Sequence, residues 1–353
     1  MAEVVVGLGT SHSPMLTLEP EDWLTYAEGD KRNPELVAPP DGLVFSYEEL
    51  VERTDPAIAQ GITPEKFQAQ HKQIQDAINT LKATLADIKP DVTVIISDDQ
   101  DELLFEDLMP AFSLYWGDTF PLVPYPANEN SGPVAWALAN GWGDIPLDVP
   151  VETGLGRHII ESMIESEFDM AHSKYIRPRS GGSIARRYPT LNGESSYVRV
   201  TEERPFGLPH GWSFIVKRLM DNAPMPIVPI FQNVYPPNQP TPRRSYAFGQ
   251  ALRKAIESWE SDKRVCLIAS GGLSHFVVDE EIDRMTIKGL KEKDMDLLCN
   301  LPRHRLNSAS SEIRNWVAAA GALEDKDIDF LEYVPVYRTP AGTGGGWTFA
   351  RWA

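Results

Sequence analysis

Short apolar runs that end in small or polar residues recur along this chain and predict buried β-strands. The first is Val-Val-Val-Gly-Leu at 4–8, and β-branched residues of this kind favour a strand over a helix. Strands are predicted at 4–8, 91–97, within 105–116, and at 225–231, 265–270, 333–337 and 347–352. The last two runs have no helical pattern between them, which indicates a mixed sheet.

Between these runs, apolar residues recur with a period near 3.6, the spacing of an amphipathic helix. The clearest helix follows Thr63, which is suited to cap it, has Pro64 at its first position and ends before Pro90. Helices are predicted over 64–89, 154–168, 211–220, 245–259, 280–300 and 308–320. Because strands alternate with helices, we predict an α/β fold with a central mixed β-sheet flanked by helices.

The chain has 353 residues and shows neither an internal repeat nor a linker, so we expect a single domain over 1–353. Two stretches depart from the regular alternation. The segment 17–62 is rich in Pro, Glu and Asp, and is expected to form a functional loop or a capping segment. The segment 173–205 breaks the pattern and is expected to be an insertion or lid.

The expected insertion carries a cluster of arginines on an otherwise acidic chain. Its members are Arg177, Arg179, Arg186 and Arg187. A guanidinium can bind a substrate carboxylate as a bidentate fork. An ordinary loop or a subunit contact explains the same residues, and the sequence leaves both interpretations open.

Composition narrows the possible partners. A net charge of −18 repels a phosphate backbone, which argues against nucleic acid. No apolar run approaches the ~20 residues of a membrane helix, and residues 1–3 lead straight into the first predicted strand, so we expect no membrane contact and no signal peptide. Cys266 and Cys299 form neither a disulfide framework nor a zinc pattern. We expect a reduced, cytoplasmic protein.

Three histidines stand where an α/β fold places its chemistry. His12 and His275 each follow closely on a predicted strand, and open α/β sheets bind their ligands beyond the carboxyl ends of the strands. His210 lies just before a predicted helix. The helix dipole at that position favours neutral imidazole, which can accept a proton.

Glu312 is the carboxylate that the pattern singles out. It shares a predicted helix with Trp316 and Ala319, which are expected to face inward, so its own side chain is expected to point into the protein. A buried carboxylate needs a cation. A metal ion and the neighbouring Arg314 are equally good candidates at this stage.

Several short motifs share their order with a known family. They are the segments 9–14, 97–100, 110–112, 209–211, 236–238 and 270–275, and the spacing from 312 to 316. Each is weak by itself. Together they make the chain resemble the class III extradiol ring-cleaving dioxygenases, the family of the β subunit of protocatechuate 4,5-dioxygenase. The resemblance covers nearly the whole chain and is strongest to the gallate and 3-O-methylgallate dioxygenase branch.

The resemblance implies a non-haem Fe(II) centre, in which two histidines and one glutamate occupy one face of an octahedron. It assigns the first histidine to His12 and the glutamate to Glu312. Gln100 stands where the family has its second histidine, and we expect it to be the third ligand. Asp99, Asp101 and His71 are also candidates for this position.

The implied activity is cleavage of a catecholic aromatic acid by O₂, with gallate, 3-O-methylgallate or protocatechuate as the type of substrate. The resemblance assigns His275 to the acid/base histidine and His210 to a second histidine that contacts a substrate hydroxyl or O₂. It implies substrate-binding positions at Ser274, Gly342 and Thr343. A homodimer or larger homo-oligomer is the implied assembly.

Further functions stay open. A dihydroxypyridine or an aminophenol is a second type of substrate, because a glycine-rich wall leaves room for a differently substituted ring. Gln100 in place of a histidine is also compatible with a catalytically silent metal-binding relative. A zinc-dependent hydrolase or lyase on a related scaffold is a third hypothesis.

Overall fold

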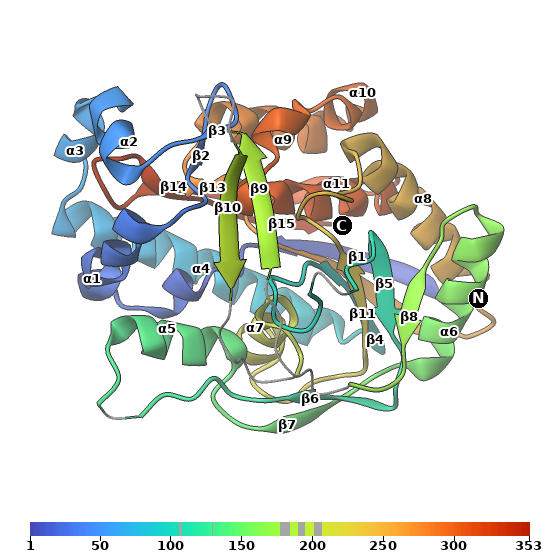
Figure 1. Cartoon of the computed structure of the whole chain (residues 1–353). Helices are drawn as coiled ribbons and strands as arrows, with labels where there is room; N and C mark the ends of the chain where they lie inside the picture. Colours follow the sequence, from blue (N-terminus) through green and yellow to red (C-terminus); the bar gives the residue numbers. More distant parts are fainter. Residues whose placement is uncertain (106–107, 129, 177–183, 190–194, 201–206) are drawn as a thin grey trace.

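The computed structural model describes residues 1–105, 108–128, 130–176 and 207–353, together with the backbone of 184–189 and 195–200. Within these residues, nine strands form one mixed sheet with helices on both faces (Figure 1). The predicted α/β class is therefore confirmed. The order of eight of the strands is β13-β15-β1-β12-β4-β11-β5-β8, and β14 pairs with β15.

Seven of the nine strands of the main sheet overlap the predicted apolar runs, whereas the short strands β8 and β13 were not predicted. The nine strands are β1 (Glu3–Thr10), β4 (Val92–Ser97), β5 (Phe112–Tyr115), β8 (Ala171–Ser173), β11 (Ile227–Gln232), β12 (Arg264–Ser270), β13 (His275–Val277), β14 (Ile328–Tyr337) and β15 (Thr343–Trp352). Among the residues that the structure describes, three small antiparallel pairs lie outside it. They are β2 (Val37–Ala38) with β3 (Leu43–Val44), β6 (Thr119–Leu122) with β7 (Leu147–Pro150), and β9 (Ile184–Pro189) with β10 (Ser195–Val200).

The helices are connected to the sheet mostly by short loops. The α-helices are α1 (Trp23–Ala27), α2 (Tyr47–Arg53), α3 (Ala57–Gln60), α4 (Pro64–Ile88), α5 (Pro133–Trp142), α6 (Thr153–Glu165), α7 (His210–Arg218), α8 (Pro242–Ser258), α9 (Glu280–Glu292), α10 (Met295–Cys299) and α11 (Ile313–Ala322). Short 3₁₀ helices are η1 (Pro14–Thr17), η2 (Pro20–Asp22), η3 (Glu28–Arg32), η4 (Arg303–Arg305) and η5 (Ser308–Glu312).

Four neighbouring strands, β1, β12, β4 and β11, run parallel and set the position of the site. Both of their faces are buried, because alternate residues enter two separate cores. Val94 belongs to the core under α6, α8 and α11, whereas its neighbour Ile95 belongs to the core under α4 and α7. Parallel strands covered on both faces read as continuous apolar runs, which explains why they were predictable.

The structure corrects several predicted elements. The helix expected over 280–300 is two helices, because Lys293 adopts a left-handed backbone (φ 53°) that ends α9. Glu312 lies at the end of η5 and not within an α-helix. The segment 17–62 contains short helices and the β2–β3 pair, and α5 lies in a stretch for which no element was predicted.

The expected insertion at 173–205 is described in part. The antiparallel strands β9 and β10 fall within it, and β9 lies beside β3 of the N-terminal segment (Figure 1). Arg177 and Arg179 lie outside the described residues, and so do the side chains of Arg186 and Arg187. The roles expected for this insertion and its arginines stay predictions.

A buried ion pair attaches the N-terminal segment to the closing hairpin. The Arg338 guanidinium donates to both carboxylate oxygens of Asp30, at 2.7 and 2.8 Å, and the Thr343 hydroxyl donates to Asp30 Oδ2 at 2.6 Å. Arg338 also lies over the ring of Tyr26. Because Asp30 and Arg338 are both buried, each needs the other to offset its desolvation.

Removal of one member of this pair should destabilise the fold strongly. We expect Asp30→Ala to lower the free energy of unfolding by about 3–5 kcal/mol, because Arg338 would keep its buried charge without a partner. Urea unfolding followed by circular dichroism measures this. The double variant Asp30→Leu, Arg338→Met should recover most of the loss, and a single-variant loss below about 1 kcal/mol would contradict the interpretation.

Candidate metal centre

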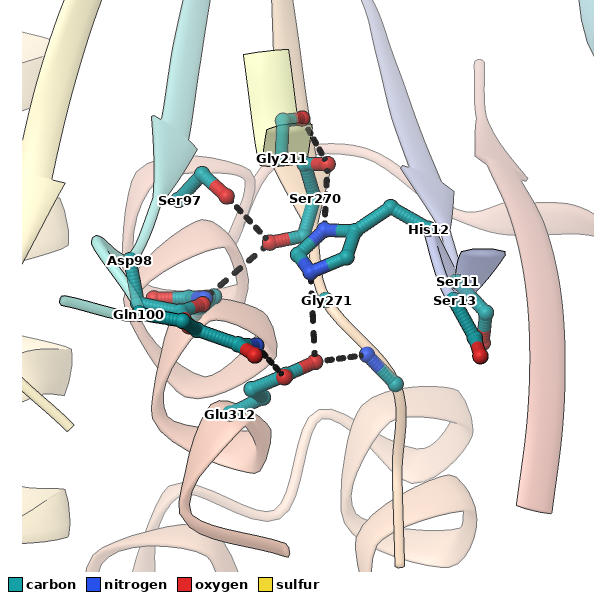
Figure 2. Close-up of polar contacts among 12 residues, drawn as sticks. Ser11, His12, Ser13, Ser97, Asp98, Gln100, Gly211, Ser270, Gly271 and Glu312 are labelled. Atoms are coloured by element: carbon teal, nitrogen blue, oxygen red, sulfur yellow. Dashed lines mark hydrogen bonds and ion pairs between the residues drawn. The ribbon is translucent and has the colours of Figure 1, made fainter. Parts of the chain in front are cut away.

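The site is assembled where three parallel strands end. His12 follows β1, Asp98 and Gln100 follow β4, and Gly272 follows β12. Because β12 pairs in parallel with both β1 and β4, these ends meet at one edge of the sheet. Glu312 enters from the start of α11. Figure 2 shows the His12 ring and the Gln100 amide facing Glu312 from different strands.

Three side chains offer ligand atoms to one point. One atom each of His12, Asp98 and Glu312 lies within 4.8 Å of the other two, and all three residues are buried. Burial and the nearby charge of Glu312 raise the pKa of Asp98 well above its usual range. Two carboxylates without solvent repel each other, so this arrangement favours a bound cation.

The hydrogen bonds of His12 leave one ring nitrogen as a lone-pair donor. The Ser270 hydroxyl donates to the Gly211 carbonyl oxygen at 2.6 Å, so it can only accept from His12 Nδ1, 3.0 Å away. The proton therefore sits on Nδ1. Nε2 lies 3.7 Å from Glu312 Oε2 and has no hydrogen-bond partner among the described residues.

Burial lowers the pKa of His12 to about 3, despite the opposing charge of Glu312. The imidazole is thus neutral at neutral pH, and its buried Nε2 carries an unused lone pair. This is the state in which a histidine binds a metal ion.

Glu312 is held as an anion by several donors. Its oxygens accept hydrogen bonds from the Gly272 amide at 2.5 Å and from His275 Nε2 at 3.1 Å. Burial opposes ionisation, but the positive charge of His275, the electrostatic effect of the nearby His12 ring and these hydrogen bonds lower the pKa of Glu312 to about 2. Arg314, the second cation considered for Glu312, donates instead to the carbonyl oxygens of Pro240 and Leu306 and does not pair with Glu312.

Gln100, the expected third ligand, reaches the site with its amide nitrogen. Nε2 donates to Glu312 Oε1 at 2.5 Å and to Asp98 Oδ2 at 3.3 Å, so it bridges the two carboxylates. Asp99 and His71 are engaged elsewhere. Asp99 accepts from the backbone amides of its own loop, and His71 packs against Trp23 from α4.

Asp98 is the donor that the motif did not single out. The sequence signal that could have identified Asp98 was its position as the first residue after β4. Its Oδ1 accepts from Asn315 Nδ2 at 2.7 Å, and Asn315 Oδ1 in turn accepts from Gln232 at 3.0 Å. These amides hold the carboxylate in place, as partners of metal ligands commonly do.

The two histidines expected to act in acid/base chemistry both border the cluster. His275 Nδ1 donates to the Leu273 carbonyl oxygen at 2.9 Å, while Nε2 faces Glu312. Burial lowers the pKa of His275, but the Glu312 charge and the hydrogen bonds outweigh it, so the net pKa is raised. The His210 ring lies edge-on to His12, with 4.7 Å between ring centroids.

The expected substrate-binding residues are engaged elsewhere. The Ser274 hydroxyl donates to Asp283 Oδ2 at 2.7 Å and accepts from the Asp279 amide at 2.8 Å. The Thr343 hydroxyl donates to Asp30. Gly342, with φ +75°, forms the turn between β14 and β15 and lines a groove of about 440 Å³ beside α2 and β13. The cluster residues do not line this groove.

The donor set fits a divalent metal ion. One imidazole nitrogen and two carboxylate oxygens are ligands that iron and manganese accept. The family's triad has two histidines and one glutamate, and the resemblance assigned His12, Gln100 and Glu312 to it in this chain. The cluster instead contains Asp98 beside His12 and Glu312. The fold and the site together thus define an α/β protein with a buried candidate metal centre at the carboxyl edge of its parallel strands.

Comparison with known proteins identifies the family. Residues 56–346 match the family described as the catalytic LigB subunit of aromatic ring-opening dioxygenase. Because the match covers well over half of the chain, the protein belongs to this family, whose dioxygenases are metal-dependent. The resemblance to extradiol dioxygenases is confirmed.

Two named proteins are similar to parts of the chain. Gallate dioxygenase of Pseudomonas putida is 30% identical over 192 residues, which are 53% of this chain and 46% of that protein. A 2,3-dihydroxyphenylpropionate/2,3-dihydroxicinnamic acid 1,2-dioxygenase of Photorhabdus laumondii is 27% identical over 221 residues, 62% of this chain and 53% of that protein. The chain spans about half the length of these relatives.

A solved structure, that of uncharacterized protein JW3007 from Escherichia coli K12, superimposes with a TM-score of 0.43 at 12% identity, over 79% of this chain and 92% of that chain. This likeness is too weak to carry an argument.

None of the helices in the described part of the chain has the length and apolar character needed to cross a membrane.

The tautomer of His12 depends on Ser270, which gives a test of the site. We expect Ser270→Ala to weaken binding of Mn(II) by about 10- to 100-fold, because Nδ1–H loses its acceptor and the ring its orientation. Anaerobic titration calorimetry measures this. Ser245→Ala, a buried serine on α8 outside the site, should leave the affinity unchanged. Equal affinities for the two variants would contradict the assignment.

Proposed function

We propose that this protein is a non-haem Fe(II) extradiol dioxygenase that opens the ring of a catecholic aromatic acid with O₂. Its family supports ring opening, and its named relatives act on gallate and on dihydroxyphenylpropionate. The observation that carries the proposal is the buried cluster of His12, Asp98 and Glu312, with His275 and His210 beside it.

In this proposal, His12 Nε2 and carboxylate oxygens of Asp98 and Glu312 hold the metal ion. Gln100 orients the two carboxylates through its amide nitrogen and takes the role of a supporting residue in place of a ligand. Fe(II), when bound, supplies coordination positions where a diol and O₂ meet and through which electrons pass between them. The protein contributes binding, orientation and proton transfer.

His275 is proposed as the acid/base residue. Its Nδ1 proton is committed to the Leu273 carbonyl, so proton transfer falls to Nε2, which donates to Glu312 in this structure. With a metal ion paired to Glu312, Nε2 would release that proton and would then accept the second phenolic proton of the diol and later return it. His210 contacts a substrate hydroxyl or O₂ through its own Nε2. Burial of both rings keeps water away from these proton transfers.

A metal-binding relative without oxygen chemistry is the second candidate. The single imidazole among the clustered donors favours it, because the family's iron triad has two. Substrate identity, cytoplasmic location and homo-oligomeric assembly stay predictions.

Oxygen consumption tests the activity. The protein, loaded anaerobically with Fe(II), should consume O₂ with gallate, 3-O-methylgallate, protocatechuate or 2,3-dihydroxyphenylpropionate and form a yellow ring-opened product. An oxygen electrode and absorption spectroscopy record both. His12→Ala should abolish uptake. Stoichiometric iron without uptake across diols, aminophenols and dihydroxypyridines would exclude the dioxygenase and favour the silent relative.

Neighbouring variants distinguish the third ligand. Asp98→Ala should weaken metal binding by more than about 100-fold, since it removes a ligand, whereas Gln100→Ala should weaken it by only about 10-fold, since it removes a supporting hydrogen bond. Calorimetry with Mn(II) measures both. The reverse order would identify Gln100 as the ligand and Asp98 as the support.

A further inference from the structure

Glu102 is a buried carboxylate for which neither the motifs nor the proposed metal site accounts. It lies in the loop after β4 and is only 1% exposed. One oxygen, Oε2, accepts from the backbone amide of His210 at 2.8 Å, and the other, Oε1, accepts from Nδ1 of the same histidine. A single carboxylate thus holds both the main chain and the side chain of His210.

The contact with the backbone amide has a role in folding. His210 is the first residue of α7, and Pro209 before it has no side chain to cap the helix. The first amides of a helix lack partners within it, and the positive end of the helix dipole favours an anion. Glu102, 108 residues earlier in the chain, supplies this cap.

The contact with the ring has a role in chemistry. A carboxylate accepts hydrogen bonds, so Nδ1 of His210 must carry a proton, and the neutral ring must have its lone pair on Nε2. The ring is further fixed between His12, at 4.7 Å, and Trp142, at 4.9 Å between centroids. Because Nδ1 is committed to Glu102, Nε2 is the ring atom available to a ligand.

The loop that carries Glu102 also carries the candidate metal donor. Asp99 folds this loop by accepting the backbone amides of Glu102, Leu103 and Leu104 at 3.2, 2.9 and 2.9 Å. Asp98, next to Asp99, faces the metal cluster. One short loop thus orients a carboxylate at the metal centre and a second carboxylate at His210.

We propose that Glu102 is a positioning residue: it fixes the ring and tautomer of His210 so that Nε2 faces the reacting diol or O₂. The inference rests on the proposed function, because it assumes that His210 acts on bound ligand. It adds a carboxylate–histidine pair to the site, in which Glu102 acts only through His210 and touches neither metal nor substrate.

A double-mutant cycle separates this role from helix capping. Glu102→Gln should lower kcat about 10-fold with KM unchanged, and His210→Gln about 100-fold. The double variant should be no slower than His210→Gln, because a residue that acts through another has no effect once its partner is gone. Multiplied effects in the double variant would overturn the proposal. Thr63→Ala, which removes the cap of α4, should lower stability and leave kcat unchanged.

A second measurement does not depend on activity. Long-range ¹H–¹⁵N spectra of the Zn(II)-loaded protein report the tautomer of each histidine, and the His210 signals are identified as those that disappear in His210→Gln. The unaltered protein should show the Nδ1–H tautomer of His210. Glu102→Gln should show the Nε2–H tautomer or a mixture of the two. An unchanged tautomer in Glu102→Gln would overturn the proposal. If the unaltered protein consumes no O₂, the dioxygenase assignment fails, and this spectrum alone decides the role of Glu102.

Discussion

Two carboxylates, Asp98 and Glu312, are buried side by side, and the rest of the site follows from that constraint. Neither has solvent to stabilise its charge, so each is surrounded by donors: Gly272 and His275 for Glu312, Asn315 for Asp98, and Gln100 for both. These donors stabilise the ionised carboxylates, but burial and the charge of Glu312 still raise the pKa of Asp98. The unused Nε2 of His12 beside them completes a site suited to a cation.

The fold supports this arrangement by spreading it over rigid elements. His12, Asp98 and Gly272 come from the ends of three hydrogen-bonded strands whose faces are buried, so their relative positions are set by the sheet. Helix starts contribute Glu312 and His210. The loop after β4 joins both groups, since it supplies Asp98 and, through Glu102, holds His210.

Part of this was predictable from the sequence. The buried strands could be predicted because parallel strands covered on both faces are continuous apolar runs. Helix α4 could be predicted because its capping residue, Thr63, is visible in the sequence. Local pattern and family resemblance also singled out His12 and Glu312, which the structure brings together in one buried cluster. The break between α9 and α10 could not be predicted, because it depends on a left-handed backbone conformation at Lys293, and lysine carries no sequence signal for that conformation. Nor could the short helices of 17–62, which depend on contacts with the rest of the chain.

The sequence by itself determined the α/β class, the strand ends that carry chemistry and membership of a ring-opening dioxygenase family, because these depend on local periodicity and on motifs in order. Only the tertiary structure decided which polar groups meet. It brought Asp98 to His12, turned the Gln100 amide nitrogen toward two carboxylates, engaged Ser274 and Thr343 elsewhere, and joined Glu102 to His210. Most of these pairings join residues far apart in the chain, and hydrogen-bond geometry in three dimensions selects among the many carboxylates of an acidic chain.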